Sequence, residues 1–224
     1  MYSNSKFVVK KDKLISPICS SYKGVRQLDG LSPLLFNLYT NDMPSIFDFS
    51  VTELVSLNTT RLNCLLYADD LILLSESEKG LQSCLDSLNS YCTRWKLKII
   101  ITKTKVMVFS KGKRKFSQFN FTTDNQHIEA VEKYKYLGVI LSYNGNMKHA
   151  AEHMYNKELK AVFSLKSKIL DFEFFSIKLK LKLFDTLIRP ITTYGSEIGI
   201  SDFSQNDLKR DNLSFEKIHY MFCK

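Results

Sequence analysis

The sequence predicts an α+β fold, in which antiparallel hairpins and helices are followed by a helical region. Apolar runs at 62–66 and 71–74, each bounded by polar residues, have the length of strands. Residues 81–91 repeat apolar side chains at helical spacing, and a helical pattern resumes at Asn146. A hydrophobic share of 44% with 25% charged residues is ordinary globular composition for 224 residues, so disorder is not expected.

The first elements are expected to be a hairpin, a loop and a helix. Residues 1–30 place apolar stretches at 7–9 and 14–15 on either side of a charged turn at 10–13. Ser32 suits a helix N-cap and Pro33 the first helical position, so we expect a helix over 31–43 that Pro44 ends. Its apolar face holds Leu34, Leu35, Leu38 and Tyr39, with Phe36 and Tyr39 expected in the core.

A polar connector at 44–61 precedes the central elements. We expect a hairpin over about 62–75, with both strands buried, and a helix at 81–91 packed under the sheet. Further strands are expected near 97–101, 105–109, 116–121 and 134–141. Beyond Asn146 the apolar residues recur at helical spacing until Pro190, and Lys178 and Lys182 share one face of that helical region.

Two adjacent carboxylates, Asp69 and Asp70, are expected to form the turn of the central hairpin. Tight hairpin turns usually carry Asn-Gly or Asp-Gly, because they need positive φ. At ~4 Å the repulsion between two such charges is about 1 kcal/mol in water and about 4 kcal/mol at an effective dielectric of 20. A divalent cation would reverse the sign of that energy. The alternative is a solvated acidic turn that binds nothing.

The loop before the first helix carries groups suited to nucleic acids. Gly24 and Gly30 allow the backbone to approach a ligand closely, while Arg26 and Gln27 offer donors for phosphates and base edges. Considered alone, this is a common arrangement of a loop entering an amphipathic helix.

Together these segments resemble the reverse transcriptases of non-LTR (LINE-type) retrotransposons. That family carries G-V-R-Q-G-x-x-L-S-P-x-L-F-N-x-Y, which 24–39 resembles, and then the Y-A-D-D hairpin found at 67–70. Residues 95–109 are similar to its W-G-L-x-x-N-x-x-K-T element, and 134–141 to its primer-grip hairpin. Residues 183–190 with Tyr194-Gly195 are similar to a segment in and beyond the family's thumb, so the resemblance spans nearly the whole chain.

The resemblance implies a partial polymerase palm over 1–142, an antiparallel sheet with packed helices, followed by a helical thumb or connection segment over 143–224. It implies RNA-directed DNA polymerase activity with two Mg²⁺ ions, or Mn²⁺, on an RNA template and a DNA primer with deoxynucleotides. Asp69 and Asp70 would bind metal, and Lys103 would protonate or stabilise the leaving pyrophosphate. Other implied contacts are template and nucleotide at Arg26, Gln27 and Tyr67, and the primer grip at Tyr136, Leu137 and Gly138.

Several positions depart from the family pattern. The family's third metal-binding carboxylate lies on a strand upstream of the Gly24 loop, where this sequence has only Asp12 in a charged turn. We therefore expect that the chain lacks the fingers and the first catalytic strand and is inactive alone. Leu28 and Lys96 stand where the family has glycine, Asp29 adds a negative charge near the substrate, and Ile100 replaces an asparagine.

The charge distribution favours a polyanionic partner. The chain has a net charge of +9, and residues 94–123 hold nine Lys or Arg and no acidic residue. This stretch ends in a basic cluster that would contact the template–primer backbone or, alternatively, is a solvated loop: Lys111, Lys113, Arg114 and Lys115.

The five cysteines show no C-x-x-C pair, and their odd number without a secretory signal predicts reduced thiols in the cytoplasm or nucleus rather than secretion. No apolar run approaches the roughly 20 residues that span a bilayer. His149 and His153 stand four apart on an expected helix, but no third ligand for zinc is evident.

Two alternatives to a truncated polymerase stay open. The chain could be a non-catalytic nucleic-acid-binding remnant, whose binding would be salt-sensitive and independent of metal. It could also be a non-functional retrotransposon relic, in which the edge of the Tyr67 hairpin is left uncovered and prone to aggregation.

Overall fold

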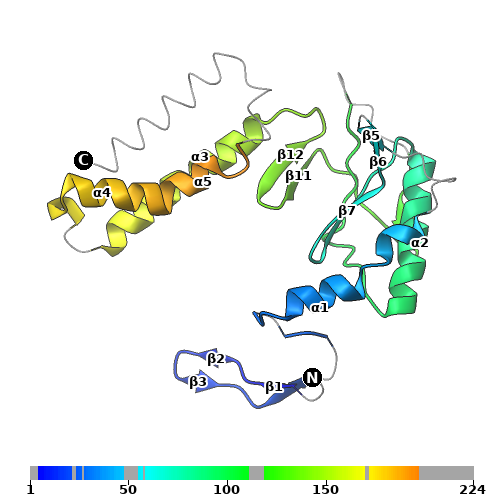
Figure 1. Ribbon diagram of the computed structural model, residues 1–224, viewed down its shortest axis with the longest axis horizontal. Coiled ribbons are helices and arrows are strands. Elements are labelled where there is room, and N and C mark those ends of the chain that lie inside the picture. The colour runs from blue at the N-terminus through cyan, green and yellow to red at the C-terminus, as the bar shows by residue number, and fades with distance from the viewer. Residues whose placement is uncertain are drawn as a thin grey trace. The chain divides into compact units, whose positions relative to one another are not determined.

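The computed structural model describes residues 5–21, 24–26, 28–47, 55–57, 59–110, 119–169 and 172–196 (Figure 1). The chain divides into two compact units. Unit 1 comprises Met1–Ile101 with Phe119–His127, and unit 2 comprises Thr102–Gln118 with Ile128–Lys224. Each unit consists of residues that pack mainly against one another. The assignment of 1–142 to a palm and 143–224 to a thumb stays a prediction.

Unit 1 begins with the expected hairpin. Strand β1 (Ser5–Phe7) pairs antiparallel with β4 (Cys19–Ser21), and between them β2 (Lys10–Lys11) pairs with β3 (Leu14–Ile15). Asp12 lies in the two-residue turn at a φ of 55° and is exposed. The charged turn expected at 10–13 is therefore confirmed for Asp12 and Lys13, whereas Lys10 and Lys11 form β2 and pair with Ile15 and Leu14.

The first helix is shorter than predicted. Helix α1 (Ser32–Tyr39) ends before a 3₁₀ turn, η1 (Met43–Ile46), which contains Pro44. The N-cap prediction for Ser32 is wrong, because Leu31 occupies that position without a side-chain cap. The Ser32 hydroxyl instead donates to the Arg26 carbonyl at 2.5 Å, so the first turn of α1 is bonded to the preceding loop.

Part of the predicted polar connector forms a hairpin of its own. Strand β5 (Val55–Leu57) pairs antiparallel with β6 (Thr60–Leu62). Strand β7 (Cys64–Tyr67) then pairs with β8 (Asp70–Leu73), which confirms the hairpin expected over 62–75. The connector prediction is wrong for 55–57 and 60–61, where Val, Leu and Thr side chains suit a strand.

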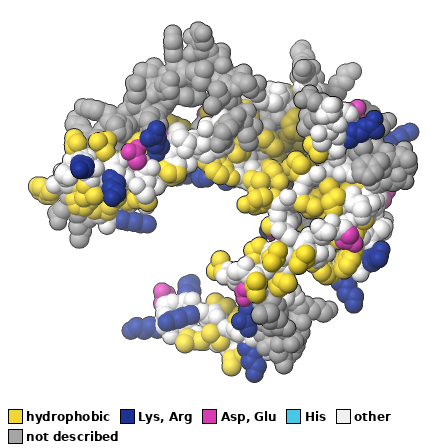
Figure 2. Space-filling view, in the orientation of Figure 1, with side chains coloured by type: hydrophobic (Ala, Val, Ile, Leu, Met, Phe, Trp, Pro, Cys, Tyr) yellow, Lys and Arg dark blue, Asp and Glu magenta, His cyan; other side chains and the backbone are white. Residues whose placement is uncertain are grey.

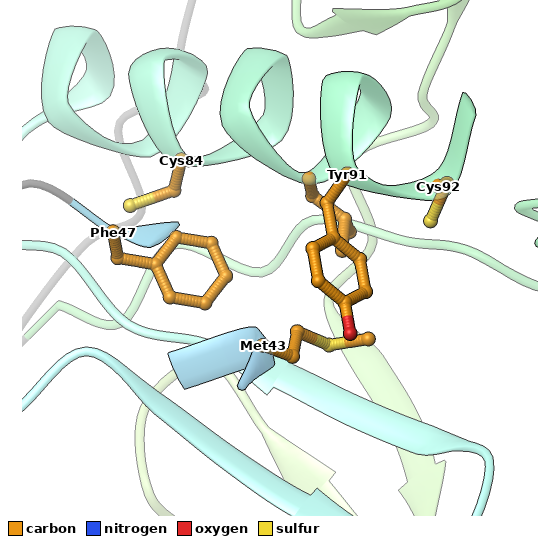
Figure 3. Packing of buried hydrophobic residues seen from close by; sticks show 6 residues of the cluster. Met43, Phe47, Cys84, Tyr91 and Cys92 are labelled. Carbon is orange, nitrogen blue, oxygen red and sulfur yellow. The ribbon is translucent and has the colours of Figure 1, made fainter. Parts of the chain in front are cut away.

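The long helix of unit 1 provides its core. Helix α2 (Glu78–Trp95) begins at Ser77, whose hydroxyl accepts from the Gly80 N–H at 3.1 Å, and ends at Lys96 in the left-handed conformation. Its buried face packs on η1 and Phe47, and side chains of β7 and β8 pack against the same cluster, as expected for 81–91 (Figure 3). The buried members of this cluster are Met43, Phe47, Cys84, Leu88, Tyr91 and Cys92.

A partly buried hydrogen bond joins α2 to the segment after α1. The Tyr91 hydroxyl donates to Asp42 Oδ1 at 2.6 Å, and burial together with this carboxylate raises the pKa of Tyr91 well above its usual value. The Tyr39 ring meets Trp95 edge-on, with centroids 5.1 Å apart, and the Tyr39 hydroxyl bonds to the Trp95 carbonyl. Tyr39 is nevertheless 41% exposed and Phe36 only half-buried, so the prediction of two core residues there is wrong.

The strands expected between α2 and residue 121 are mostly not formed. Residues 97–101 adopt turn and irregular backbone, and within 105–109 only Val106 makes a bridge, parallel to Ala130. Of 116–121, the first three residues lie outside the described ranges and 119–121 are irregular. A short hairpin of β9 (Thr122–Thr123) and β10 (Gln126–His127) follows. Two hydrogen bonds join it to α2: Gln82 Nε2 donates to the Thr122 carbonyl, and the Thr122 N–H donates to Gln82 Oε1.

The described part of unit 2 contains a hairpin of two four-residue strands and the predicted helical region. Strand β11 (Lys133–Tyr136) pairs with β12 (Val139–Ser142), which confirms the hairpin at 134–141. Helix α3 (Lys148–Lys168) follows. The remaining helical segments are η2 (Phe172–Phe174), α4 (Ile177–Leu183), the π-helical turn η3 (Phe184–Ile188) and α5 (Arg189–Thr193).

Two hydrophobic clusters hold unit 2 together. Val139 of β12 packs on Ala150 and Met154 of α3, and the second cluster joins α3 to η2 and η3 through Val162, Phe172, Phe184 and Ile188. Two charged side chains are buried with them. Lys180 lies over the Phe172 ring, 5.3 Å from its centroid, and Glu158 is 1% exposed.

Every sheet within the described ranges has two strands, and much apolar surface stays exposed. Figure 2 shows hydrophobic side chains at the surface of the molecule. In α1 the residues expected to face the core are exposed instead, including Leu34 and Leu38. The mixture of helices with small antiparallel sheets agrees with the predicted α+β class. No helix in the described part of the chain is long and apolar enough to cross a membrane.

Candidate functional site

The two adjacent carboxylates lie at the tip of the β7–β8 hairpin, as expected. Tyr67 pairs with Asp70, so the turn consists of Ala68 and Asp69, and Asp70 is the first residue of β8. The prediction that Asp69 and Asp70 together form the turn is therefore wrong by one position. Ala68 supplies the positive φ of 53° that the tight turn needs.

Both carboxylates are exposed, and their side chains are available to a ligand from solvent. Carboxylate oxygens are the donors that Mg²⁺ prefers, but a magnesium site usually draws on further carboxylates, substrate phosphates or water. The described residues contain no group of three or more His, Cys, Asp or Glu placed to hold a metal. Asp69 and Asp70 thus fit part of a magnesium site and do not complete it.

Strand β7 is more exposed than predicted. Leu65 and Leu66 are 44% and 39% exposed, and Tyr67 is 63% exposed. The prediction of two buried strands fails for β7, because Leu65 and Leu66 are not among the side chains that pack against the α2 core. Leu71 and Leu73 of β8, with Cys64, contact the α2 core instead. Tyr67 consequently projects beside Asp70 rather than packing in the interior.

The loop before α1 is held by short-range bonds. Asp29 Oδ1 accepts from the Leu31 N–H at 2.9 Å, and the Arg26 carbonyl accepts from Ser32. The Arg26 side chain is exposed, and Gln27 lies outside the described residues. Leu28 is fully exposed at a φ of 63°, a conformation that favours glycine. The positive φ at this position explains why glycine suits it better than leucine.

Lys103 belongs to unit 2, whereas Asp69 belongs to unit 1. The Lys103 side chain is exposed, and its carbonyl accepts from the Tyr134 hydroxyl at 3.0 Å. Its backbone is thus fixed to the β11–β12 hairpin. The expected role of its ammonium group at a leaving pyrophosphate stays a prediction.

The predicted primer-grip residues form the tip of the β11–β12 hairpin. Leu137 and Gly138 are its turn, with φ of 44° and 89°. The Tyr194 hydroxyl donates to the Leu137 carbonyl at 2.6 Å, and a Cβ on Gly138 would lie 3.2 Å from Tyr194 Cε1. Tyr194, which follows α5, therefore contacts this turn through a hydrogen bond and through its ring. The sequence analysis identified the hairpin at 134–141 and Tyr194-Gly195 separately, but no local pattern predicted that they are in contact.

The basic cluster predicted to contact a nucleic-acid backbone lies outside the described residues: Lys111, Lys113, Arg114 and Lys115. Other basic residues were not singled out by sequence reasoning. Lys133 and Lys135 of β11 line a cleft against α3 together with His149 and His153. Alternation along β11, which places residues two apart on one face, is the signal that could have identified the two lysines.

The family is shown by comparison with known proteins. The reverse transcriptase (RNA-dependent DNA polymerase) family matches residues 9–141, which is more than half of the chain. The match includes the β7–β8 hairpin and all of the β11–β12 hairpin except its last residue, Ser142. The chain therefore belongs to this family.

Its relatives narrow the type to the non-LTR retrotransposons. The Pol polyprotein from type-1 retrotransposable element R2 of Nasonia vitripennis is 32% identical over 157 residues, which are 65% of this chain and 15% of that protein. A probable RNA-directed DNA polymerase from transposon BS of Drosophila melanogaster is 25% identical over 187 residues, 78% of this chain and 19% of the relative.

The RNA-directed DNA polymerase from mobile element jockey of Drosophila funebris is 29% identical over 146 residues, 62% of this chain and 15% of its own length. The chain is thus a reverse transcriptase domain of non-LTR type that spans less than a fifth of the length of these relatives.

Proposed function

We propose that the chain is part of an RNA-directed DNA polymerase, in which Asp69 and Asp70 provide two of the carboxylates for template-primed nucleotidyl transfer. The observation that carries this proposal is the pair of exposed carboxylates at a hairpin tip within the family match. The adjacent Tyr67 side chain is exposed beside them, where a nucleotide or primer terminus could contact it.

Divalent magnesium, when bound, supplies activation of a primer hydroxyl and stabilisation of the pyrophosphate leaving group. Asp69 and Asp70 would hold it. Lys103 would donate a proton to the pyrophosphate or stabilise its negative charge. Arg26 and Gln27 would contact template or nucleotide, and the turn at Leu137 and Gly138 would position the primer end.

We further propose that these 224 residues do not polymerise DNA by themselves. Asp12 precedes the Gly24 loop, but it lies exposed in a turn between strands of two residues each. Such a turn does not resemble the apolar strand that carries the third carboxylate in the family. Activity would then need a further carboxylate supplied by sequence outside residues 1–224.

A second candidate is binding of nucleic acid without catalysis. The net charge of +9 favours it, since lysines and arginines that neutralise phosphates release counterions. Binding of this kind would weaken as salt rises and would not change when Mg²⁺ is removed.

Primer extension on an RNA template with Mg²⁺ or Mn²⁺ tests the proposal. Three proteins are compared: the parent chain, Asp69→Ala, and Asp124→Asn as a control. Asp124 is an exposed turn residue of the β9–β10 hairpin at a φ of 49°, so this change removes one acidic charge from a similar setting. We expect no extension by any of them, and equal binding of a template–primer duplex at low salt.

The same assay is repeated with the upstream family strand fused to the N-terminus. Extension that returns in this fusion and is lost again with Asp69→Ala, but not with Asp124→Asn, supports the metal role of Asp69. Extension by the unfused parent and not by Asp69→Ala would contradict the proposed inactivity. Absence of both extension and duplex binding would favour a non-functional relic.

A further inference from the structure

Helix α4 in unit 2 is oriented with a lysine inward and apolar side chains outward. Lys180 is 5% exposed, whereas Ile177 is 64% and Leu181 is 37% exposed. Burial of a lysine is costly, and an exposed isoleucine contributes nothing to the core, so the usual preferences of these residue types are reversed here. The outer side of α4 is therefore more apolar than its position at the surface requires.

Two contacts of Lys180 hold α4 in this orientation. Its Nζ atom donates to the Glu173 carbonyl at 3.3 Å and lies 5.3 Å from the centroid of the Phe172 ring. Phe172 belongs to the hydrophobic cluster that joins α3 to η2 and η3. A rotation of α4 that buried Ile177 and Leu181 would break both contacts, so these side chains stay at the surface.

The exposed apolar side chains lie close together. Ile177 and Leu181 are one helical turn apart and form a row along α4. Phe174 of η2 is 87% exposed and precedes Ile177 by three residues, which span at most ~11 Å of chain. Phe174 also lines a hollow of about 260 Å³, together with Lys166, Ile169, Phe172 and Glu173. An exposed apolar group of this kind indicates contact with another molecule.

A row of lysines runs beside the apolar row. Lys178 and Lys182 each follow an apolar residue of that row, are one turn apart and are exposed. Residues 166–182 contain five lysines and two acidic residues. Figure 2 shows hydrophobic and basic side chains next to one another over α4, which Figure 1 labels. The surface is thus both apolar and positively charged.

We propose that this surface docks an amphipathic helix of a partner protein, and that the polar side of the partner helix is acidic. Apolar side chains of the partner would cover the row, and its carboxylates would lie against the lysines. The docking surface, called the α4 face below, consists of Phe174, Ile177, Lys178, Leu181 and Lys182.

Two other occupants match the α4 face less well. A nucleic-acid backbone would pair with the lysines but would leave the aliphatic side chains of Ile177 and Leu181 uncovered. A second copy of this chain would cover the apolar row but would add a second set of lysines and no carboxylate from the same face. An acidic amphipathic helix matches both the apolar row and the charge.

Fluorescence anisotropy with the full chain measures docking. The probes are three stapled helices of about 16 residues that share one row of leucines. Their polar sides carry glutamate, glutamine or lysine. Because the α4 face is small, we expect a Kd of roughly 50 µM for the glutamate helix, binding about fivefold weaker for the glutamine helix, and none for the lysine helix. Tightest binding of the glutamine or the lysine helix would overturn the proposal.

Charge reversal separates the α4 face from the general positive charge of the chain. Lys178→Glu combined with Lys182→Glu should weaken binding of the glutamate helix about tenfold and make the lysine helix the preferred probe. The control is Lys157→Glu combined with Lys160→Glu, a pair of exposed lysines on α3, which should keep the preference of the parent chain. An unchanged preference in the first double variant, or equal losses in both, would overturn the proposal.

Removal of an apolar side chain tests the other component of the α4 face. Ile177→Ser should weaken binding of the glutamate helix about fivefold. Since Ile177 is exposed, the fold should not change, which circular dichroism verifies. The control is Leu34→Ser, at an exposed leucine of α1, which should have no effect. Equal binding by Ile177→Ser and the parent would mean that charge alone attracts the helix, which overturns the proposal.

The same variants identify the other two occupants. A single-stranded 12-mer DNA that displaces the glutamate helix, and that binds less tightly to the Lys178→Glu and Lys182→Glu double variant but equally to Ile177→Ser, would identify nucleic acid. Self-association of the parent chain in sedimentation that is lost in Ile177→Ser would identify a second copy. Either result overturns the proposal. None of these measurements needs metal or primer extension, so a failure of the polymerase proposal leaves the docking result intact.

Discussion

The β7–β8 and β11–β12 hairpins share local geometry and differ in what surrounds them. Each pairs four residues with four across a two-residue turn, and each begins that turn at positive φ, at Ala68 and at Leu137. The β11–β12 turn is bonded to Tyr194, and Val139 at the start of β12 is buried against α3. At the other turn, the described residues place no comparable clamp on Ala68 or Asp69.

The difference teaches that a hairpin and its burial have separate causes. Short-range pairing and a turn residue with positive φ are enough for both hairpins to form. Burial of a strand needs a partner surface, which α3 gives to Val139 of β12. Leu65 and Leu66 of β7, which point to opposite faces of the hairpin, are both exposed and lack such a surface among the described residues. The open tip carries the proposed chemistry, and the clamped tip carries the proposed primer contact.

The largest expected effect comes from disturbing the clamped turn. Gly138→Ala places a Cβ 3.2 Å from the Tyr194 ring at a φ of 89°. A side chain in the left-handed region is costly, so we expect the free energy of unfolding to fall by about 2 kcal/mol. Urea denaturation followed by circular dichroism measures this. Gly30→Ala, which has open space and no positive φ, should change little, and equal losses would remove the contrast.

The stability of the folded state should fall as pH rises, because a buried carboxyl of α3 loses its proton. Glu158 of α3 is 1% exposed, and burial raises the pKa of its carboxyl, which the Thr192 hydroxyl lowers by a smaller amount. The folded state therefore binds the proton more tightly than the unfolded state. The stabilising contribution is complete below the unfolded pKa of Glu, about 4.3, and is lost as pH rises through the higher folded pKa.

Replacing this carboxyl tests the sign. We expect Glu158→Gln to raise the free energy of unfolding at pH 7 by about 1.5 kcal/mol, because no buried charge then forms. It should also flatten the dependence of stability on pH above 4.3. Thermal unfolding at a series of pH values measures both. Glu152→Gln, on the exposed side of the same helix, is the control, and an equal gain from it would contradict burial as the cause.

The hydrogen bond from Tyr194 to the Leu137 carbonyl should make a smaller contribution to the free energy of unfolding. Tyr194→Phe keeps the ring beside Gly138 and removes the 2.6 Å bond to the Leu137 carbonyl. A bond between partly exposed neutral groups contributes about 1 kcal/mol, and we expect that loss of stability. The matching change in the open hairpin, Tyr67→Phe, should have almost no effect on stability. Hydrogen exchange of the Gly138 and Val139 amides should quicken in Tyr194→Phe alone.

The smallest effect is expected at the open tip. Ala68→Gly relieves a φ of 53° at the cost of greater freedom in the unfolded chain. The two terms nearly cancel, so we expect a gain of roughly 0.5 kcal/mol at most. Chemical denaturation, with Lys96→Gly at the left-handed end of α2 for comparison, measures it. A loss of stability at either position would mean that backbone strain is not limiting there.

The sequence predicts those features that depend on neighbouring residues. The α2 helix, the two four-residue hairpins and the helical region after Asn146 follow from periodicity and turn positions. The resemblance described in the sequence analysis predicts glycine where Leu28 and Lys96 stand, and both residues lie at positive φ. The local backbone is thus predictable even where the side chain is unusual.

Features that depend on distant residues were not predictable. Serine is a residue type that favours the N-cap position, but the Ser32 hydroxyl donates a hydrogen bond to the Arg26 carbonyl instead. Leu65 and Leu66 have the composition of a buried strand, but their exposure is decided by which surface covers them. The cleft that brings Lys135 to His153 combines a strand and a helix, and periodicity within each element cannot show that they meet.

The bond from Tyr194 to Leu137 also sets an order of folding. It joins residues 57 apart in the chain, whereas the hairpin that it holds closes over a two-residue turn. Pairing of β11 with β12 can thus begin within microseconds, but the clamp must wait until α3 to α5 have collapsed onto one another. A nascent chain would present this turn loosely throughout synthesis and fix it only after residue 194 had emerged.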